Sequence, residues 1–345
     1  MEEVKTHQRR VRYKGTHPKK FNEKYKEHNP EKYKETVDKV ISKGSTPAGM
    51  HISIMVNEIL DFFNIQENQN GLDVTLGYGG HTLEMLKKLN NTGHMYALDA
   101  DPIEFEKTTK RISGFGYKNF TPINMNFANI MELKKYDVKF DFILADLGVS
   151  SMQIDDPSRG FSYKHDTTLD LRLDPTKGIS AKERLEKISL YELEGMLVEN
   201  ADEPNALCIS EAIVNEVKMN KTIETTKRLR EVIEEALFNK YKTVEKETIK
   251  KTCQRVFQAI RIDINEEYEV LYELLENLPN LLNPGGKVAI LTFHSGEDRL
   301  VKKAFKRQHK IGLYSQINDE ITLPSKEECF KNPRAKSTKM RYAIK

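Results

Sequence analysis

The sequence has few cysteines and lacks any long apolar run. Its 345 residues include only three cysteines, Cys208, Cys253 and Cys329, which lie far apart and form no Cys-x-x-Cys or Cys/His cluster. We therefore expect no disulfide framework, no structural zinc and no other metal site. No apolar segment approaches the ~18 residues that span a bilayer, and residues 1–20 contain no signal-peptide hydrophobic stretch. These absences predict a soluble, cytoplasmic protein without a membrane partner.

Charge is unevenly distributed along the chain. The net charge is +3, but residues 1–44 carry +6, residues 299–345 carry +9, and the segment between them carries −12. Basic ends around an acidic centre suggest a polyanionic partner such as RNA or DNA, because Lys and Arg neutralise phosphates and release counterions. Solubilising tails are the alternative, and charge alone does not separate the two.

The composition pattern divides the chain into four segments. Residues 1–46 form a basic extension in which aromatic residues lie among lysines, with one short helix expected. Residues 47–174 and 253–345 are predicted to form the two parts of one α/β domain, the second ending in a basic segment. Residues 175–252 have helical periods and no strand signals, so we expect a helical insertion there. Its candidate role is substrate recognition, which the periodicity itself does not show.

Strand-like and helix-like segments alternate in the first part of the α/β domain. We expect a short helix over 54–62, strands at 72–76, 94–98 and 140–145, and helices at 81–89 and 103–112. The last of these strands is apolar throughout, as in a parallel strand covered on both faces. The alternation predicts an open α/β sheet that binds ligands at the carboxyl ends of its strands.

Helical stripes dominate the predicted insertion. Apolar residues recur at helical spacing over 209–217 and 229–237, and Thr225 is a plausible cap for the second stripe. A long helix is expected over 256–278, followed by a turn at Asn283-Pro284-Gly285-Gly286 and a strand over 287–293. The α/β domain is therefore expected to resume after the insertion.

A glycine-rich turn follows the first predicted strand. The sequence Gly77-Tyr78-Gly79-Gly80-His81 would let the backbone approach a ligand at a helix N-terminus, although a tight turn alone also explains the glycines. Asp99 lies 22 residues after Gly77, at the end of the next predicted strand. A carboxylate in that place can accept both ribose hydroxyls of a nucleoside. The pair favours an adenosine-containing ligand.

Two features separate the possible ligands. The turn lacks the third glycine of Gly-x-Gly-x-x-Gly, which in dinucleotide folds allows close packing around a pyrophosphate. S-adenosylmethionine has no pyrophosphate, so the pattern favours it over a nicotinamide dinucleotide. Asp146 ends the apolar strand and opens the polar loop Asp146–Gln153, where the transferred methyl group should lie; a helix cap is the alternative for any one of these residues.

Seven sequence blocks give a more specific resemblance. They are Asp73–His81 (DVTLGYGGH), Asp146–Gln153 (DLGVSSMQ), Arg159–Ser162 (RGFS), Leu169–Asp174 (LDLRLD), Phe257–Ile262 (FQAIRI), Phe293–Arg299 (FHSGEDR) and Asn332–Arg334 (NPR). In this order they resemble the ribosomal small-subunit RNA (cytosine-N4)-methyltransferase H family, also called MraW, over about residues 51–341. The resemblance implies a Rossmann-like class I S-adenosylmethionine-dependent methyltransferase with an inserted all-helical domain.

The resemblance also implies site residues and partners. Cofactor contacts are expected at Gly79, Gly80, His81, Asp99, Phe127, Asp146 and Gln153. The implied reaction is RNA methylation at N4 of a cytosine in 16S ribosomal RNA, with the small ribosomal subunit as partner. Members of the family are often dimeric, so a homodimer is left open.

The chemistry suggests which residues act on the base. The exocyclic amine of cytosine is a poor nucleophile, so the site must orient it and accept its proton. We expect catalytic roles for Asp146, which orients the amine, and for Asp170, His294 and Asp298, with Arg172 and Glu297 lining the base pocket and Arg299 on phosphate. In the alternative interpretation Asp170–Arg172 and Asp298–Arg299 are structural ion pairs and His294 is a strand-end residue.

The chain departs from the family pattern on the substrate side. Gly296 stands where the family usually has leucine in His-Ser-Leu-Glu-Asp-Arg, and the opening His-x-Pro is His51-Ile52-Ser53. These departures are consistent with a divergent member and leave a different methyl acceptor open, although the retained Arg159-Gly160-Phe161 and Leu169-Asp170 favour the same base. A second hypothesis is a ribosome-assembly factor that binds cofactor and RNA with weak or no transfer. A third, a nicotinamide-dependent oxidoreductase, is disfavoured by the glycine pattern.

Overall fold

The computed structural model describes residues 53–219 and 221–345. The predicted basic extension over 1–46 lies outside these residues, as does the opening at His51. Within the described ranges no helix combines the length and the apolar character needed to cross a membrane. The elements are α3 (Val56–Phe63), β1 (Asn70–Asp73), α4 (Gly80–Leu89), β2 (His94–Asp99), α5 (Pro102–Ser113), β3 (Phe120–Asn124), η2 (Phe127–Tyr136), β4 (Phe140–Asp146), α6 (Ser151–Asp155), η3 (Pro157–Arg159), α7 (Ala181–Lys187), α8 (Leu190–Ala201), α9 (Ala206–Lys218), α10 (Thr226–Tyr241), α11 (Lys246–Ile264), α12 (Glu267–Leu281), β5 (Leu282–Thr292), α13 (Ser295–Lys310), β6 (Gln316–Ile317), α14 (Lys326–Lys331), η4 (Pro333–Ser337) and β7 (Lys339–Ile344).

The strands form a seven-stranded sheet in the order β3-β2-β1-β4-β5-β7-β6. Strands β1 to β5 run parallel, whereas β7 is antiparallel to both β5 and β6. The order of the strands reverses between β1 and β4, and at such a switch point the carboxyl ends of the strands open a crevice for a ligand. The predicted open α/β sheet is confirmed.

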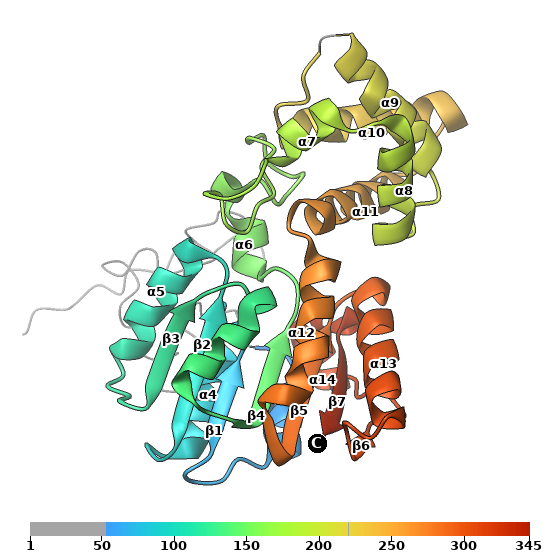
Figure 1. Cartoon of the computed structure of the whole chain (residues 1–345). Helices are drawn as coiled ribbons and strands as arrows, with labels where there is room; N and C mark the ends of the chain where they lie inside the picture. Colours follow the sequence, from blue (N-terminus) through green and yellow to red (C-terminus); the bar gives the residue numbers. More distant parts are fainter. Residues whose placement is uncertain (1–52, 220) are drawn as a thin grey trace, which may run out of the picture. The chain divides into compact units, whose positions relative to one another are not determined.

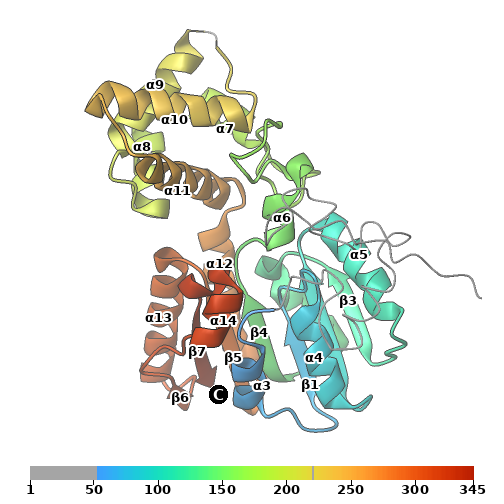
Figure 2. The same ribbon diagram turned by 180° about the vertical axis from the view of Figure 1, so that it is seen from behind.

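Helices cover both faces of this sheet. The apolar run of β4 alternates between them: Ile143 and Ala145 share a core with α12 and α13, whereas Phe142 and Leu144 share a core with α3, α4 and α5. Figure 1 shows α12 and α13 on one face, and Figure 2 shows α3, α4 and α5 on the other. Burial on both faces explains why β4 has no polar alternation.

The helical segment has a core of its own. Apolar residues of α7 to α11 pack together with Leu169 and Leu171 of the preceding loop. The predicted cap is confirmed, since the Thr225 side chain accepts a hydrogen bond from the Arg228 backbone N–H at the start of α10. Helix α11 runs across the expected boundary between 252 and 253, so the insertion and the second part of the α/β domain share one helix.

The prediction of one long helix over 256–278 is wrong. Helix α11 ends at Ile264 and α12 begins at Glu267, because Glu266 adopts a left-handed conformation with φ of 50°. The Asn265 side chain fixes the break by donating to the Leu171 carbonyl at 2.8 Å and accepting from the Leu173 N–H at 2.7 Å. A loop about 90 residues earlier in the chain thus determines where the helix stops.

Two strand predictions differ from the structure at their ends. Strand β1 covers 70–73 rather than 72–76, although the Val74 and Leu76 N–H groups still donate to the Leu144 and Leu98 carbonyls of the neighbouring strands. Strand β5 begins at Leu282, so the predicted turn at 283–286 lies within it, where the pairing with β4 shifts register. Strands β3, β6 and β7 were not predicted.

Candidate active site

The glycine turn opens the site at the carboxyl end of β1. Gly79 precedes α4 with φ of 70°, a conformation that favours glycine. A Cβ atom there would lie 2.8 Å from Ile112 Cδ1 and 2.9 Å from Thr108 Cγ2 of α5. Packing against α5 therefore requires a glycine, and Gly80 occupies the first position of α4 directly after it.

Asp99 lies beside this turn at the end of β2. Its two carboxylate oxygens accept hydrogen bonds from the Gly77 N–H at 2.7 Å and the Asp101 N–H at 2.8 Å. Each carboxylate oxygen has a further lone pair, so Asp99 can still accept two ribose hydroxyls. Burial raises the pKa of Asp99 to about 7.

Asp101 is a functional candidate that sequence reasoning missed. It is 1% exposed, caps α5, and accepts hydrogen bonds from Arg159 at 2.6 Å and from Gln153 at 2.8 Å. The Gln153 carbonyl oxygen accepts from the Ser150 N–H. Gln153 thus joins the loop after β4 to the end of β2. The second hydrogen of its side-chain amide is left for a ligand. The Asp101-Pro102 sequence, typical of a helix N-terminus, was the available signal.

His81 and Asp146 face each other across the switch point, 3.5 Å apart between His81 Nε2 and an Asp146 carboxylate oxygen. Burial lowers the pKa of His81, but its interaction with Asp146 outweighs this and raises the pKa overall. His81 Nε2 and Asp146 Oδ1 are buried and have no hydrogen-bond partner among the described residues. His81 Nε2 still has the ion-pair contact with the other Asp146 oxygen, whereas Asp146 Oδ1 has no such contact. Buried polar atoms normally have partners, so Asp146 Oδ1 points to a bound ligand.

Threonine hydroxyls fix the strand ends beneath this pair. The Asp146 N–H donates to the Thr75 hydroxyl at 2.7 Å, and Asp73 accepts from Thr75 and from Thr82 of α4. Burial raises the pKa of Asp73. Phe127 lies half-buried at the start of η2, directly after β3. The predicted cofactor residues therefore gather along one edge of the sheet.

His294 and Glu297 lie at the carboxyl end of the neighbouring strand β5. His294 caps α13, and its Nε2 is 3.2 Å from a Glu297 carboxylate oxygen. Glu297 also accepts from the Phe293 N–H at 2.8 Å. Burial would raise the pKa of Glu297, but His294 and this N–H outweigh it and lower the pKa. A Cβ on Gly148 would be 3.8 Å from Glu297, so this pair borders the loop that follows Asp146.

The structure assigns partners to the remaining acidic candidates. Asp170 accepts two hydrogen bonds from Arg172, each of 2.7 Å, so the expected Asp170–Arg172 ion pair is confirmed. Partial burial would raise the pKa of Asp170, but the hydrogen bonds from Arg172 outweigh it and lower the pKa. The suggested Asp298–Arg299 pair is wrong. Asp298 instead accepts from Arg341 at 2.6 Å and Lys339 at 3.2 Å of β7.

Exposed Arg299 is 3.6 Å from Asp202, at the end of α8. This weak contact leaves the guanidinium open to solvent, where it can still meet a phosphate. A catalytic role for Asp170 or Asp298 stays a prediction, but both carboxylates already have cationic partners.

A tyrosine occupies the space above Gly296. A Cβ on Gly296 would overlap the Tyr268 hydroxyl, which donates to the Asn200 carbonyl of α8 at 3.2 Å. Tyr268 thereby links α12 to both the helical segment and the start of α13. The departure from leucine at position 296 is explained by this close packing.

Two carboxylates and an imidazole that are candidate metal ligands also lie close together near this tyrosine. Single atoms of Glu267, His294 and Glu297 lie within 4.8 Å of one another, a spacing that a cation can bridge. Arg261 already donates to both Glu267 oxygens at 2.7 and 2.9 Å. Its guanidinium therefore neutralises part of the cluster, and the absence of a metal stays a prediction.

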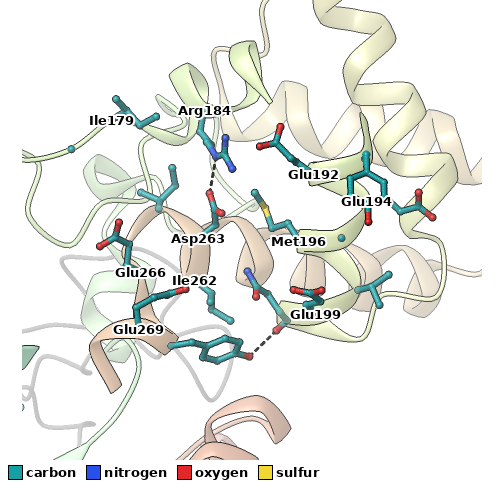
Figure 3. A pocket seen from close by; sticks show the side chains of 17 residues that line it. Ile179, Arg184, Glu192, Glu194, Met196, Glu199, Ile262, Asp263, Glu266 and Glu269 are labelled. Atoms are coloured by element: carbon teal, nitrogen blue, oxygen red, sulfur yellow. Dashed lines mark hydrogen bonds and ion pairs between the residues drawn. The ribbon is translucent and has the colours of Figure 1, made fainter. Parts of the chain in front are cut away.

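A cavity of about 950 Å³ lies between α7 and α8 on one side and the α11–α12 break on the other. Figure 3 shows carboxylates around it, with Arg184 paired to Asp263. Its acidic lining residues are Glu192, Glu194, Glu199, Asp263, Glu266 and Glu269. Because Arg184 is the one basic residue among its described lining, the cavity repels phosphate.

Together, the sheet order, the glycine turn and the carboxylate at the end of β2 define a Rossmann-like class I methyltransferase that uses S-adenosylmethionine. The particular family follows from the sequence. The model of the MraW methylase family matches residues 48–345, and the chain belongs to that family.

Three relatives illustrate the match. The chain is 64% identical to ribosomal RNA small subunit methyltransferase H 1 of Lachnoclostridium phytofermentans, over 98% of this chain and 93% of that protein. It is 56% identical to methyltransferase H 2 of Acholeplasma laidlawii over 98% of both chains. The methyltransferase H 1 of the same organism is 37% identical, over 86% of this chain and 99% of its own length.

Proposed function

We propose that this protein transfers a methyl group from S-adenosylmethionine to N4 of a cytosine in 16S ribosomal RNA, working in the cytoplasm on the small ribosomal subunit. The observation that carries the proposal is Asp146 Oδ1, a buried carboxylate oxygen with no hydrogen-bond partner among the described residues, at the same edge of the sheet as Asp99. Membership of the methylase family and the names of the relatives support small-subunit ribosomal RNA as the substrate.

The residues at the edge of the sheet fit the cofactor. Asp99 has lone pairs for the ribose hydroxyls, Gly79 and Gly80 allow the backbone close to the ligand, and Phe127 is an apolar neighbour for a purine ring. When bound, S-adenosylmethionine supplies an electrophilic methyl carried on a sulfonium sulfur. Gln153 holds the loop around Asp146 in place through Asp101.

The protein's own task is to orient the amine and take its proton. Cytosine N4 gains a methyl group and loses one proton, and an Asp146 carboxylate that accepts a hydrogen bond from the amine can take that proton. His81, within 3.5 Å, compensates the charge of Asp146 while it remains ionised. The target base must leave its stack to reach this crevice. The His294–Glu297 pair borders the same loop and is placed to line the base pocket.

The other segments have proposed roles outside the chemistry. The helical segment over 175–252 recognises the substrate, and the basic extension over 1–46 adds salt-dependent affinity for RNA. The four relatives that match 98–100% of this chain share most of this extension, whereas those that match 85–86% leave part of the chain unmatched. A homodimer is testable by sedimentation.

The test is methyl transfer from labelled S-adenosylmethionine to small subunits that lack the family's modification. Digested nucleosides are separated and identified by mass spectrometry, with Asp146→Asn as the inactive comparison. N4-methylcytidine is the expected product. A labelled nucleoside other than N4-methylcytidine, or no label despite measured cofactor binding, would contradict the proposal and favour another acceptor or an assembly role.

A further inference from the structure

The short helix α14 carries the most exposed large apolar side chain of the described residues. Phe330 is 88% exposed, followed by Tyr191 at 86%. Solitary exposed apolar residues are common, so exposure alone has no functional meaning. Phe330 is a candidate for a binding role because of the position of α14 and the charges around it.

Two contacts fix α14 and η4 beside the active site. Glu328 accepts a hydrogen bond from the Met55 N–H at 2.8 Å, and its charge contributes to the raised pKa of His81. Arg334 pairs with Asp155 at 3.2 Å, at the end of α6, which follows the Asp146 loop. Phe330 lies between these two anchors in the sequence, so it is held at the border of the crevice.

The segment 326–336 around Phe330 has four basic and two acidic residues, a net charge of +2. Lys326, Lys331 and Lys336 are all exposed, and Lys331 pairs with Glu327. Lys326 and Lys336 form no ion pair with the residues in 53–219 or 221–345. An exposed aromatic ring among free cations is the arrangement that binds single-stranded nucleic acid, because bases stack on the ring and lysines hold phosphates.

The charge of the α14–η4 border differs from that of the cavity described above. The acidic cavity at the α11–α12 break has the opposite charge and disfavours RNA there.

We propose that the α14–η4 border docks single-stranded RNA next to the target cytosine. Phe330 stacks on one unpaired base, while Lys326 and Lys336 contact phosphates. The inference rests on the proposed function, since it takes the substrate to be RNA. The docking surface would position the RNA strand while the crevice at Asp146 receives the target base.

The test compares Phe330 with an exposed aromatic residue far from the crevice. Phe330→Ala should raise the KM for small subunits and the Kd for a single-stranded fragment of small-subunit RNA by about tenfold, because the stacked base is lost. Phe330→Tyr keeps a ring and should behave like the unchanged protein. Phe115→Ala is the control and should change neither value, because Phe115 is 42% exposed in the turn between α5 and β3, at the opposite edge of the sheet from the crevice. Melting temperature and S-adenosylmethionine affinity should stay the same in all three.

Salt dependence gives a second readout. Lys336→Ala should reduce the slope of log Kd against log salt concentration by about 1, since one phosphate contact is lost. Unchanged RNA affinity in Phe330→Ala would overturn the proposal. So would weaker binding to subunits with unchanged binding to RNA, since that result would indicate a protein partner at Phe330.

The binding result and the reaction product are separate measurements. If the unchanged protein makes no N4-methylcytidine but Phe330→Ala still weakens RNA binding, the docking surface stands and the proposed reaction fails. If N4-methylcytidine forms and Phe330→Ala binds RNA normally, the reaction stands and the docking surface fails.

Discussion

The cofactor side and the base side of the crevice are built in different ways. The polar contacts around Asp99 join residues that are near in sequence or lie at the ends of adjacent strands. An example is the hydrogen bond from the Gly77 N–H to the Asp99 carboxylate. Around Glu297 the contacts join distant segments, with Arg261, Glu267 and Tyr268 arriving from the α11–α12 break. Asp146 lies where the two sides meet, in contact with His81 and in the loop that borders Glu297.

This difference has a physical consequence. The cofactor side depends on backbone geometry that few residues other than glycine can adopt. The base side depends on paired charges and on a tyrosine that touches the helical segment, so it can change by paired substitutions. The base side is accordingly where this chain departs from the family pattern, at Gly296.

Gly79→Ala should have the largest effect on the cofactor side. The left-handed conformation would cost about 1–3 kcal/mol, and the added methyl would press on Ile112 and Thr108. We expect S-adenosylmethionine to bind about tenfold to hundredfold more weakly by calorimetry. Gly116→Ala is the control, because Gly116 has φ of 78° but nothing within 4 Å of the added Cβ. Equal losses in both variants would show that strain, and not the α5 contact, matters.

Gly296→Leu tests the base side. The new side chain would displace Tyr268, so kcat on small subunits should fall by about tenfold through overpacking of about 1–3 kcal/mol. Cofactor affinity should hardly change. Adding Tyr268→Ala should restore most of the rate by making room for leucine. A double variant that stays as slow as Gly296→Leu would show that the contact between position 296 and Tyr268 does not limit the rate.

Acid pH should weaken the cofactor side. Because the pKa of Asp99 is raised to about 7, its carboxyl is mostly protonated at pH 6 and mostly ionised at pH 8. Cofactor binding favours the ionised acceptor, so affinity should rise about fivefold from pH 6 to pH 8. Asp99→Asn should bind weakly at both values and lose most of this change. Any slope that remains belongs to the other groups of this edge with a raised pKa, His81 and Asp73.

Asp298→Asn should affect stability more than rate. Losing charged hydrogen bonds to Arg341 and Lys339 should lower the free energy of unfolding by about 2 kcal/mol in urea titrations. The turnover number should change by less than twofold. A hundredfold slower variant with normal stability would instead support the catalytic role first expected for Asp298.

The contact between the glycine turn and the end of β2 was easier to predict from the sequence than the contacts around Glu297, for a physical reason. Gly77, Gly79 and Asp99 follow strands whose periodicity is visible within a few residues, so their meeting at one edge could be inferred. The break after Ile264 could not, because the side chain of Asn265 bonds to a loop 92–94 positions away.

Long-range partners were likewise hidden. Asp298 was expected to pair with its neighbour, yet its partner Arg341 lies 43 residues later on an unpredicted antiparallel strand. Similarly, Arg159 belongs to a recognised block, but nothing local indicates that it reaches the buried Asp101. Local patterns predicted the elements, while pairings between distant charges depend on the assembled fold.

The central claim is that Asp146 joins the two sides and handles the amine of the target base. Single-turnover methyl transfer to small subunits by Asp146→Asn at saturating S-adenosylmethionine tests it most directly, with cofactor affinity measured in parallel. We predict a rate about 1,000-fold lower, within the range for a lost general base, and a cofactor affinity within about threefold of the unchanged protein. Transfer at the full rate with normal cofactor binding would contradict the account.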